Sequence, residues 1–535
     1  TLASYDMNRE DGIKFEWSAS TNGFVNASTY KMYYKLSNAS EWTLEGQQSN
    51  TDYVLAWSNL TNDTYDFMVS ACGSENDCND SNTLTIDVVT YDDGDAGGES
   101  DGGGVSFEII DANIDNSVTG SNWQNSVFNG GSPGRISGST WTGATDNTWS
   151  SATNWLAGVP IATSDAIIPS GLTNYPTVVS DVTVHAVTLE SGVTLIAEST
   201  FGGTITYNRN LGTNNWYLVS SPVSGETIQN LIANHTFATG TDPNIGIAPY
   251  DNSQATINDR WDYQTVGSTG SVTVGKGYSV KLNATGDISF TGILNTADVS
   301  IALIQGSGGG GDDFNLLGNP FTSFINSDDF LTTNTAELTS QTIWLWNQAT
   351  NSYDTKVTAD TFQIAPAQGF FVKANSTNNV TFAESIQDHK TTDTFQRDSR
   401  PEIHVFLNDD ENNARHSKIY YINGTTTGFD NGYDGELFGG SQNSFEIYSH
   451  LLADNQNKKY QIQSLPNSDY ESMVIPIGIK ADAGKEITFS AETMNLPTDL
   501  KVFLEDKEAN IFTRLDEANT EYTVTLSEAL DGIGR

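Results

Sequence analysis

The residues best suited to chemistry in this sequence are carboxylates gathered in two turns. Asp430, Asp434 and Glu436 lie in one turn, and Asp409 and Asp410 lie in the other. Oxygen donors clustered in a turn suit Ca²⁺, and a neighbouring glycine lets backbone carbonyls join the ligands. The sequence therefore predicts Ca²⁺ as the single candidate cofactor. With 67 acidic residues in the chain, paired carboxylates say almost nothing about general acid–base catalysis.

Two short motifs match enzyme signatures but lack a residue that the chemistry needs. Gly130–Gly134 fits the Gly-x-Ser-x-Gly pattern of a hydrolase, but Pro133 follows the serine and has no N–H to donate to an oxyanion. Gly270–Gly277 nearly matches a phosphate-binding loop, but its last glycine replaces the magnesium-binding Ser or Thr. Both are predicted to be turns. The histidines form no metal-ligand pair at helical spacing, although His404 and His416 can meet across strands.

Three tryptophans form the most distinctive aromatic pattern. Trp141, Trp149 and Trp155 follow the spacing W-T-G-x(5)-W-x(4)-N-W. Exposed in a row, they would stack on sugar rings, whereas buried side chains would cap a set of stacked strands. The buried cap is favoured, and sugar stacking is the alternative.

The two cysteines, Cys72 and Cys78, lie close together in a predicted hairpin tip. No Cys-x-x-Cys motif and no adjacent histidine pair accompanies them. A disulfide in an oxidising compartment is therefore favoured over free thiols and over a metal site.

Composition excludes several classes of partner. The 67 acidic and 24 basic residues give a net charge of -43, which repels nucleic acid backbones and anionic lipid. No apolar run approaches the roughly 20 residues of a membrane-spanning helix, so direct membrane insertion is not expected. Asn, Thr, Ser and Gly are abundant, as in short strands and turns. The predicted fold class is all-β, with tandem β-sandwich domains, a stacked-strand (β-helix-like) segment and little helix.

A duplication organises the middle of the chain. Asn215–Pro222 matches Asp313–Pro320, with 98 residues from Pro222 to Pro320, and Gly277–Lys281 matches Gly369–Lys373, with 92 residues between the glycines. A period this long predicts two copies of one β-rich unit rather than a short-period solenoid. The repeated positions are aromatic, aliphatic, Gly and Pro. No nucleophile or acid–base pair recurs with them.

These patterns divide the chain into seven predicted segments. They are a sandwich at 1–91, an acidic Gly-rich linker at 92–104, a Trp-rich stacked-strand segment at 105–211, repeat copies at 212–305 and 306–385, a linker at 386–400 and a C-terminal sandwich at 401–535.

The first segment resembles a fibronectin type III domain. Trp17 matches the early core tryptophan of that family, and Leu60 followed by Tyr65 matches its tyrosine corner. The resemblance implies a spacer or a binding surface, because catalysis is rare in such modules.

The tryptophan motif is similar to the opening of large surface proteins from the Bacteroidetes. The C-terminal segment, with the turn Phe429–Asp434 and the strand end Leu504–Asp506, is similar to the sandwich that precedes the sorting domain of type IX secretion cargo. The resemblance implies a secreted or outer-membrane surface location and the type IX machinery as a partner. Because the chain opens at Thr1 and stops at Arg535, we expect a processed or truncated product that lacks the sorting domain.

Two functions from different classes follow. The favoured one is a non-catalytic adhesin or stalk that contacts extracellular polysaccharide or another surface protein. The alternative is an accessory carbohydrate-binding tail of a secreted polysaccharide-degrading enzyme or protease whose catalytic domain lies upstream. A lyase within these residues is disfavoured, because a groove for an anionic polymer needs basic residues and this chain has few.

Overall fold

The computed structural model describes residues 2–6, 13–17, 29–56, 63–72, 78–88, 105–109, 123–129, 136–306, 313–389, 400–441, 443–468 and 470–534. Among these residues strands predominate, joined by turns and loops, with two α-helices and five short 3₁₀ turns, so the predicted all-β class is confirmed. Neither α-helix is long and apolar enough to cross a bilayer. The 3₁₀ turns are η2 (Ala152–Asn154), η3 (Ile257–Arg260), η4 (Thr358–Asp360), η5 (Glu384–Ile386) and η6 (Tyr470–Ser472).

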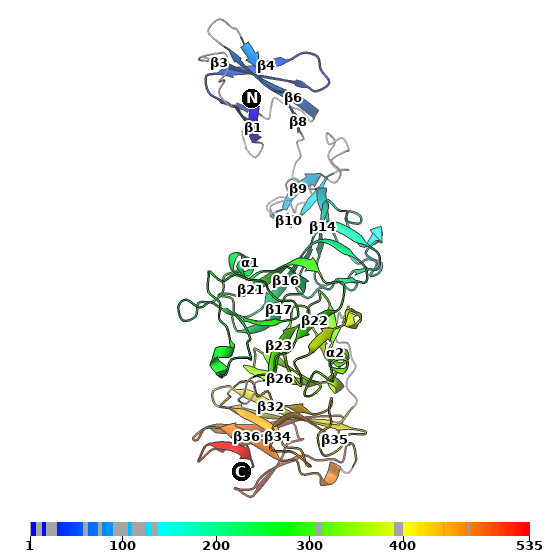
Figure 1. Ribbon diagram of the computed structural model, residues 1–535, viewed down its shortest axis with the longest axis vertical. Helices are drawn as coiled ribbons and strands as arrows, with labels where there is room; N and C mark the ends of the chain where they lie inside the picture. The colour runs from blue at the N-terminus through cyan, green and yellow to red at the C-terminus, as the bar shows by residue number, and fades with distance from the viewer. Residues whose placement is uncertain are drawn as a thin grey trace. The chain divides into compact units, whose positions relative to one another are not determined.

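Several sequence predictions fall outside the described residues. They are the linker at 92–104, positions 390–399 of the second linker, Gly130–Gly134, Leu60 and the side chain of Trp17. The chain forms two compact units. Unit 1 comprises Thr1–Ser139 with Thr163–Asp165, and unit 2 comprises Thr140–Ala162 with Ala166–Arg535 (Figure 1).

Unit 1 contains a sandwich of two antiparallel sheets. The first has the order β1 (Leu2–Asp6), β2 (Ile13–Trp17), β5 (Asp52–Leu55). The second contains β4 (Thr43–Gln48), β3 (Thr29–Leu36) and β6 (Asp63–Cys72), and both β7 (Cys78–Asp80) and β8 (Leu84–Val88) pair with β6. Phe15 of β2 contacts Phe67 of β6, with ring centroids 4.7 Å apart, which closes the core between the sheets. The strands that follow are β9 (Val105–Ile109), β10 (Trp123–Asn129) and β11 (Ile136–Thr140).

Stacked strands follow, as the sequence predicts for this segment. They are β12 (Ser164–Ile168), β13 (Thr177–Val178), β14 (Val182–Leu189), β15 (Ile196–Ala197) and β16 (Phe201–Leu211). Thr177 pairs with Ile196, and Val182 pairs with Phe201, so both parallel pairs join residues 19 positions apart (196 − 177 and 201 − 182). The stack therefore has one coil per 19 residues at this point.

The two copies of the predicted repeat follow within unit 2. Copy 1 contains the end of β16, β17 (Tyr217–Ser220), β18 (Val223–Ser224), α1 (Ile228–Asn234), β19 (Ile247–Pro249), β20 (Gly277–Val280) and β21 (Gly286–Leu294). Copy 2 contains β22 (Val299–Ala302), β23 (Phe314–Gly318), β24 (Phe324–Asn326), α2 (Ser327–Thr333), β25 (Thr342–Asn347), β26 (Ser352–Val357), β27 (Gln363–Ile364), β28 (Gly369–Lys373), β29 (Asn379–Phe382) and β30 (Gln387–Asp388).

Strand register is the same in both copies. Ser220 of β17 lies opposite Gly277 of β20, and Gly318 of β23 lies opposite Gly369 of β28. The closing strand β21 pairs with β16, and β29 pairs with β22 in the equivalent way. Each copy therefore begins one strand earlier than predicted, because the boundaries at 212 and 306 separate β16 from β21 and β22 from β29.

The copies contact each other reciprocally. The N–H of Ser220 donates to the carbonyl of Ala367 (3.1 Å), and the N–H of Gly318 donates to the carbonyl of Gly275 (3.0 Å). The two donors, Ser220 and Gly318, are equivalent at the repeat offset of 98, and the two acceptors, Gly275 and Ala367, are equivalent at the offset of 92. The two hydrogen bonds are therefore the same contact made in both directions. Such an exchange is the mark of a local two-fold axis between equivalent surfaces.

Glycines permit this close approach. A Cβ on Gly277 would lie 2.6 Å from the carbonyl oxygen of Leu317, and a Cβ on Gly369 would lie 3.0 Å from the carbonyl carbon of Leu218. The two glycines thus face equivalent strands of the opposite copy. This is why the sequence repeats a glycine at the start of each of these strands.

The C-terminal sandwich of unit 2 contains a curled sheet and a separate hairpin (Figure 1). The main path of the sheet is β40 (Tyr522–Thr525), β37 (Glu486–Met494), β31 (Glu402–Asp409), β32 (Ala414–Ile422), β35 (Tyr460–Pro466), β34 (Glu446–Ser449), β36 (Ile477–Ala481), β41 (Leu530–Ile533), with β33 (Gly435–Glu436) paired to β35. The hairpin joins β38 (Phe503–Asp506) to β39 (Ile511–Arg514).

Candidate functional site

The three tryptophans are buried, so sugar stacking by these side chains is wrong. Trp141, Trp149 and Trp155 are 0%, 1% and 4% exposed. Trp149 and Trp155 meet edge to face at 4.7 Å, and the Trp155 indole donates to the Trp149 carbonyl (2.7 Å). Asn154 of the motif is also buried, and it accepts from the N–H of Thr145 (2.9 Å). The motif therefore builds a cap on the stacked strands.

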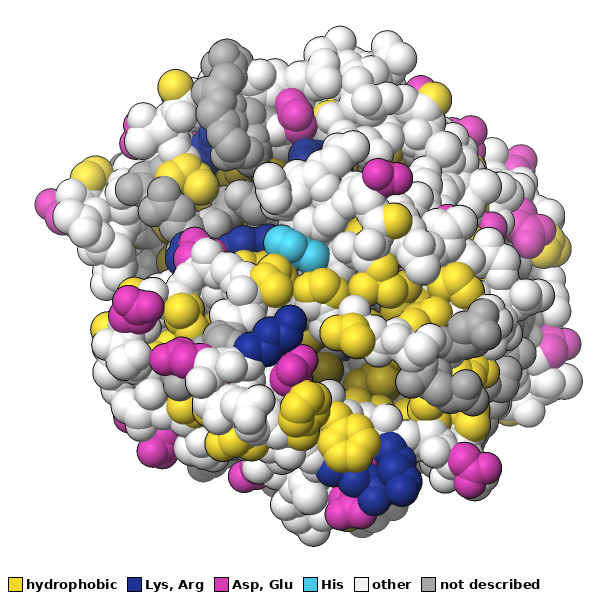
Figure 2. All heavy atoms as spheres, turned by 90° about the horizontal axis from the view of Figure 1, so that it is seen from below, with side chains coloured by type: hydrophobic (Ala, Val, Ile, Leu, Met, Phe, Trp, Pro, Cys, Tyr) yellow, Lys and Arg dark blue, Asp and Glu magenta, His cyan; other side chains and the backbone are white. Residues whose placement is uncertain are grey.

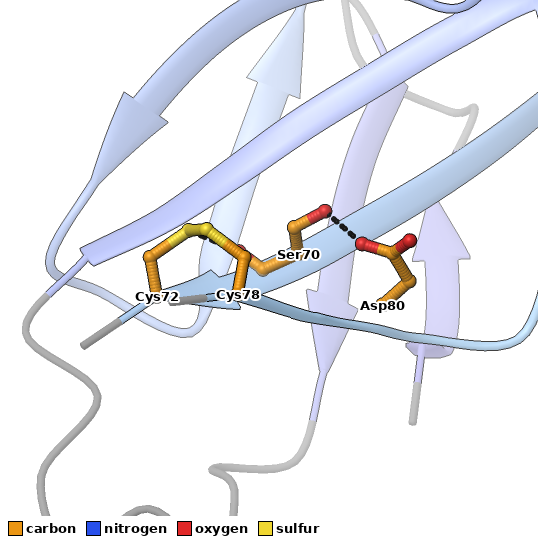
Figure 3. Close-up of a disulfide and its surroundings, with 4 residues drawn as sticks. All are labelled: Ser70, Cys72, Cys78 and Asp80. Atoms are coloured by element: carbon orange, nitrogen blue, oxygen red, sulfur yellow. Dashed lines mark hydrogen bonds between the residues drawn. A yellow bond between two sulfur atoms is a disulfide. The ribbon is translucent and has the colours of Figure 1, made fainter. Parts of the chain in front are cut away.

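The cysteines lie opposite each other on β6 and β7 and form a disulfide (Figure 3). Beside it, the Ser70 hydroxyl donates to the Asp80 carboxylate, so a second side-chain contact ties the same two strands. The pair links the two strands of a short hairpin of unit 1.

The carboxylates of the first predicted calcium loop have other partners. Asp434 is buried and accepts from the N–H groups of Asp430 and Ser464 (2.6 Å each). Burial raises the pKa of Asp434 to about 7, against the effect of these two donors. Glu436 forms an ion pair with Lys458 instead. The Asp430 carboxylate accepts from the N–H of Thr426 (2.5 Å), so the three predicted ligands serve three different contacts.

The second predicted calcium loop is likewise closed on itself. Asp409 accepts from the N–H and the amide of Asn413 (2.8 Å each) and pairs with Lys485 (3.3 Å), whereas Asp410 is exposed. Within the described part of the chain, no three His, Cys, Asp or Glu side chains converge as metal ligands. Calcium binding stays a prediction.

A charged cluster that the sequence did not predict joins copy 2 to the C-terminal sandwich. Arg400 pairs with Glu402 (2.7 Å) and with Asp360 (3.0 Å) of copy 2, and its guanidinium lies 3.8 Å from the ring centre of Tyr420. The Tyr420 hydroxyl donates to Asp360 (3.0 Å), and His404 contacts Glu402 (2.8 Å). Arg400 and Asp360 lie 40 residues apart, so no local sequence signal marks the pair.

The neighbouring histidine and lysine have the perturbed pKa values that often mark active sites. Burial lowers the pKa of His416 to about 4 and also lowers the pKa of Lys418. His404 and His416 do lie on adjacent strands, but each faces its own carboxylate, Glu402 or Asp354. The cavity beside His416 measures about 10 Å³, at the limit for one water molecule. This arrangement joins two modules and has no room for a substrate there.

An apolar groove of about 640 Å³ opens in the C-terminal sandwich. Figure 2 shows hydrophobic side chains gathered around a recess on this face. The groove lies between the sheet and the hairpin, and its volume is within the usual range for ligand sites. Its apolar lining includes Ile403, Tyr421, Met473, Ile477, Phe489 and Leu504.

Polar residues also line this groove, among them Lys501, Glu505 and Lys507. Tyr421 meets Tyr470 edge to face at 5.0 Å, and the Tyr522 hydroxyl donates to Asp506 (2.6 Å). Burial raises the pKa of Tyr421 to about 12, so its hydroxyl stays protonated at neutral pH. The groove can therefore hold an apolar partner, and the residues that line it do not form a nucleophile–base pair.

Comparison with protein families gives a match over the second part of the chain. The model of a family described as a domain of unknown function (DUF8693) matches residues 196–362 and 351–531. Together these matches span the end of the stack, both copies and most of the C-terminal sandwich. A search of curated proteins found no match.

Proposed function

We propose a structural role for this chain, which belongs to the family described as a domain of unknown function (DUF8693). In this proposal it is a non-catalytic, modular β protein of the cell exterior that acts as a stalk or adhesin. It reaches the surface as cargo of the type IX secretion machinery. Extracellular polysaccharide or another surface protein is its partner there.

One observation carries the proposal: the aromatic and polar residues of unit 2 are used to join its modules to one another. Phe438 of the C-terminal sandwich contacts Phe314 (4.6 Å between ring centroids) and Tyr353 (4.0 Å) of copy 2. His389 at the end of copy 2 lies between the hydroxyls of Thr177 (2.8 Å) and Thr194 (2.7 Å) of the stack. A chain built this way transmits load from module to module.

The location rests on different support. A disulfide between Cys72 and Cys78 persists in oxidising surroundings, and reducing compartments open such bonds. The strongly acidic composition suits a soluble exterior part. The type IX route rests on the resemblance of the tryptophan motif and the C-terminal sandwich.

Calorimetry of the full chain tests the stalk. We expect unit 2 to unfold in one transition, and Phe438→Ala to lower the temperature of that transition. Independent melting of the modules in the unaltered protein contradicts a load-bearing array.

A glycan array and a hydrolysis screen test the competing classes. The alternative, a carbohydrate-binding tail, loses its best support with the burial of Trp141, Trp149 and Trp155. Glycan binding by the full chain would restore it. Turnover of any polysaccharide or peptide in the screen would overturn the non-catalytic proposal.

A further inference from the structure

We propose that the outer face of copy 1 binds a segment of a partner protein that presents a glutamate and, two positions later, a phenylalanine. This face, the copy 1 aromatic face, consists of Trp216, Tyr263 and Lys281. The equivalent face of copy 2 already holds such a segment of the C-terminal sandwich. The inference rests on the proposed function, since it specifies the surface protein that the stalk or adhesin contacts.

The occupied face of copy 2 shows what the site binds. The ring of Phe314 lies 4.6 Å from the ring of Phe438, measured between centroids. The Lys373 ammonium lies 3.6 Å from the Glu436 carboxylate and 5.7 Å from the centre of the Phe314 ring. A phenylalanine and a lysine that face each other across β23 and β28 therefore receive both a ring and a carboxylate from the sandwich.

Copy 1 presents the same types of side chain at the equivalent positions. Trp216 corresponds to Phe314 at the offset of 98, and Lys281 corresponds to Lys373 at the offset of 92. The antiparallel register of β17 with β20 continues to Trp216 and Lys281, which makes them cross-strand neighbours as well. The ring and the ammonium that bind the sandwich in copy 2 are therefore repeated in copy 1.

Tyr263 adds a second ring to this face. It lies two residues after Trp261, as Thr355 lies two residues after Tyr353. Trp261 and Tyr353 are equivalent, because each pairs with an aromatic residue of the preceding chain segment. The rings of Tyr263 and Trp216 meet edge to face, with centroids 5.8 Å apart. Copy 1 therefore has more aromatic surface here than copy 2.

The two faces differ in what covers them. Tyr263 is 39% exposed, whereas Thr355 at the equivalent position is 2% exposed under the sandwich. Trp216 and Lys281 are half-buried, whereas Phe314 is 3% exposed. Exposed aromatic side chains grouped at one place mark an interaction site. Among the described residues, the sandwich covers only the copy 2 version of this face.

The copy 1 aromatic face is continuous with the interface that holds the sandwich. Phe371 of copy 2 contacts Phe438 of the sandwich, with ring centroids 4.9 Å apart. The same ring contacts Tyr250 (4.9 Å) and Trp261 (6.1 Å) of copy 1. Tyr263 follows Trp261 on the same segment. The aromatic surface therefore extends past the bound sandwich to the exposed rings of copy 1.

The charges around the face accept a single carboxylate. Asp242 and Asp262 are the acidic residues of the two loops that flank it, and Lys281 lies on the face itself. Copy 2 has Asp354 at the position of Asp262, yet its lysine still pairs with Glu436. The net charge of -43 opposes an acidic partner at long range, but salt screens exposed charges beyond about 8 Å.

The lysine favours a protein segment over a sugar. A neutral sugar ring would stack on Trp216 or Tyr263 and leave the Lys281 ammonium without a carboxylate. A glutamate supplies that carboxylate, and charge-assisted contacts are the stronger ones. The sandwich of a second copy is a poor occupant, because its own Glu436 and Phe438 are already bound to copy 2. The partner is therefore another protein that presents the same two groups.

Photo-crosslinking with a short peptide tests the face. The probe has the sequence of residues 435–440, with a benzophenone amino acid in place of the phenylalanine. With the full 535-residue protein, we expect crosslinks around Trp216 and Tyr263, located by mass spectrometry. Copy 2 should stay closed to the probe, because the tethered sandwich competes at high effective concentration. Crosslinks confined to copy 2, or scattered over the surface, overturn the proposal.

Matched variants identify the side chains that bind the probe. Tyr263→Ala should lower the crosslink yield at least about fivefold. The control is Tyr433→Ala, because Tyr433 is 42% exposed and lies outside the face, and it should leave the yield unchanged. Equal effects of the two tyrosine variants contradict the proposal. Circular dichroism of each variant checks that it is folded.

A double-mutant cycle tests the ion pair. Lys281→Gln should lower the yield about two- to fivefold, and so should a probe with glutamine in place of its glutamate. Together the two changes should cost little more than either one, because they remove the same contact. Additive losses would show that Lys281 does not bind the glutamate and would overturn the proposal.

A glycan array distinguishes a sugar ligand. Glycan binding that is lost in Tyr263→Ala, without crosslinking of the peptide, would assign the face to a sugar and overturn this inference. Failure of the peptide leaves the stalk role standing, because calorimetry of the unaltered protein measures contacts within unit 2. The two proposals therefore fail on different measurements.

Discussion

Copies 1 and 2 share one fold and differ in what surrounds them. Copy 1 continues the sheet of the stack through β21 and β16, whereas copy 2 contacts the C-terminal sandwich through β25 and β26. The difference is visible at one equivalent position, where Ala248 lies opposite Ser279 in copy 1 and Trp344 lies opposite Phe371 in copy 2. The Trp344 indole donates to the carbonyl of Glu436 in the sandwich (2.9 Å).

This difference shows how duplication can build a longer array. The strand registers and the reciprocal contacts stayed the same, and the outer surfaces changed to suit different neighbours. Substitutions at the two-fold axis should therefore destabilise both copies. A substitution on an outer surface should destabilise only the contact of that copy with its own neighbour.

The largest expected effect is at the border of copy 2 with the sandwich. Phe438 packs against Phe314, Tyr353 and Phe371, so Phe438→Ala should lower the free energy of unfolding by about 4 kcal/mol. The matched control is Phe429→Ala, because Phe429 is 40% exposed, and its cost should stay below about 1 kcal/mol. Urea unfolding measures both. Similar losses would show that the aromatic contact is not the joint.

The next effect is at the two-fold axis, where equivalent residues meet. A Cβ on Gly318 would lie 2.2 Å from the Cβ of Ser220, so Gly318→Ala should cost about 3 kcal/mol. Ser220→Gly alone should cost less, and the double variant should recover most of the loss because the clash is removed. Urea unfolding of the four proteins gives the coupling energy. Additive losses would argue against a shared axis.

Acid should weaken both borders of copy 2. Burial lowers the pKa of both His389 and His416 to about 4. His389 of copy 2 lies against the stack, and His416 of the sandwich faces Asp354 of copy 2. The pKa of histidine in the unfolded chain is near 6.5. The contribution of the neutral, buried histidines to the folding free energy is therefore complete above pH 6.5 and is lost as the pH falls toward 4. Each histidine should account for about 3 kcal/mol. The melting temperature should fall less between pH 7 and pH 4 in His389→Gln and in His416→Gln than in the unaltered protein. An unchanged pH dependence in both variants would show that these histidines do not cause the loss of stability in acid.

The smallest effect compares two solutions to one local problem. His235 accepts from the N–H of Ser289 (2.9 Å) after α1, and Asn334 accepts from the N–H of Thr381 (2.8 Å) after α2. Asn334 also donates to the carbonyls of Phe330 and Thr381. We expect Asn334→Ala to cost about 2 kcal/mol and His235→Ala about 1 kcal/mol by thermal unfolding. A larger loss for His235→Ala than for Asn334→Ala would mean that the hydrogen bonds of Asn334 contribute less than the ring contact of His235 with Phe237.

Sequence patterns captured the strands and the duplication better than the sites. Glycines, prolines and aromatic residues recur at the two offsets because strand starts and close contacts need those residue types. The boundaries were misplaced because β22 and the end of β16 share no such residues. The two predicted calcium loops stay predictions, because a sequence shows acidic residues but not the N–H groups and lysines that contact them.

The sequence by itself determined the all-β class, the repeat and the position of its glycines, because these depend on local spacing and on steric needs within a few residues. Tertiary structure alone decided which side chains are buried, which are paired and which are exposed for binding. It buried the tryptophan cap, joined Arg400 to Asp360 across two modules and left an apolar groove beside β41. The physical reason is that burial and charge pairing depend on residues brought together from distant parts of the chain, and no local pattern encodes that encounter.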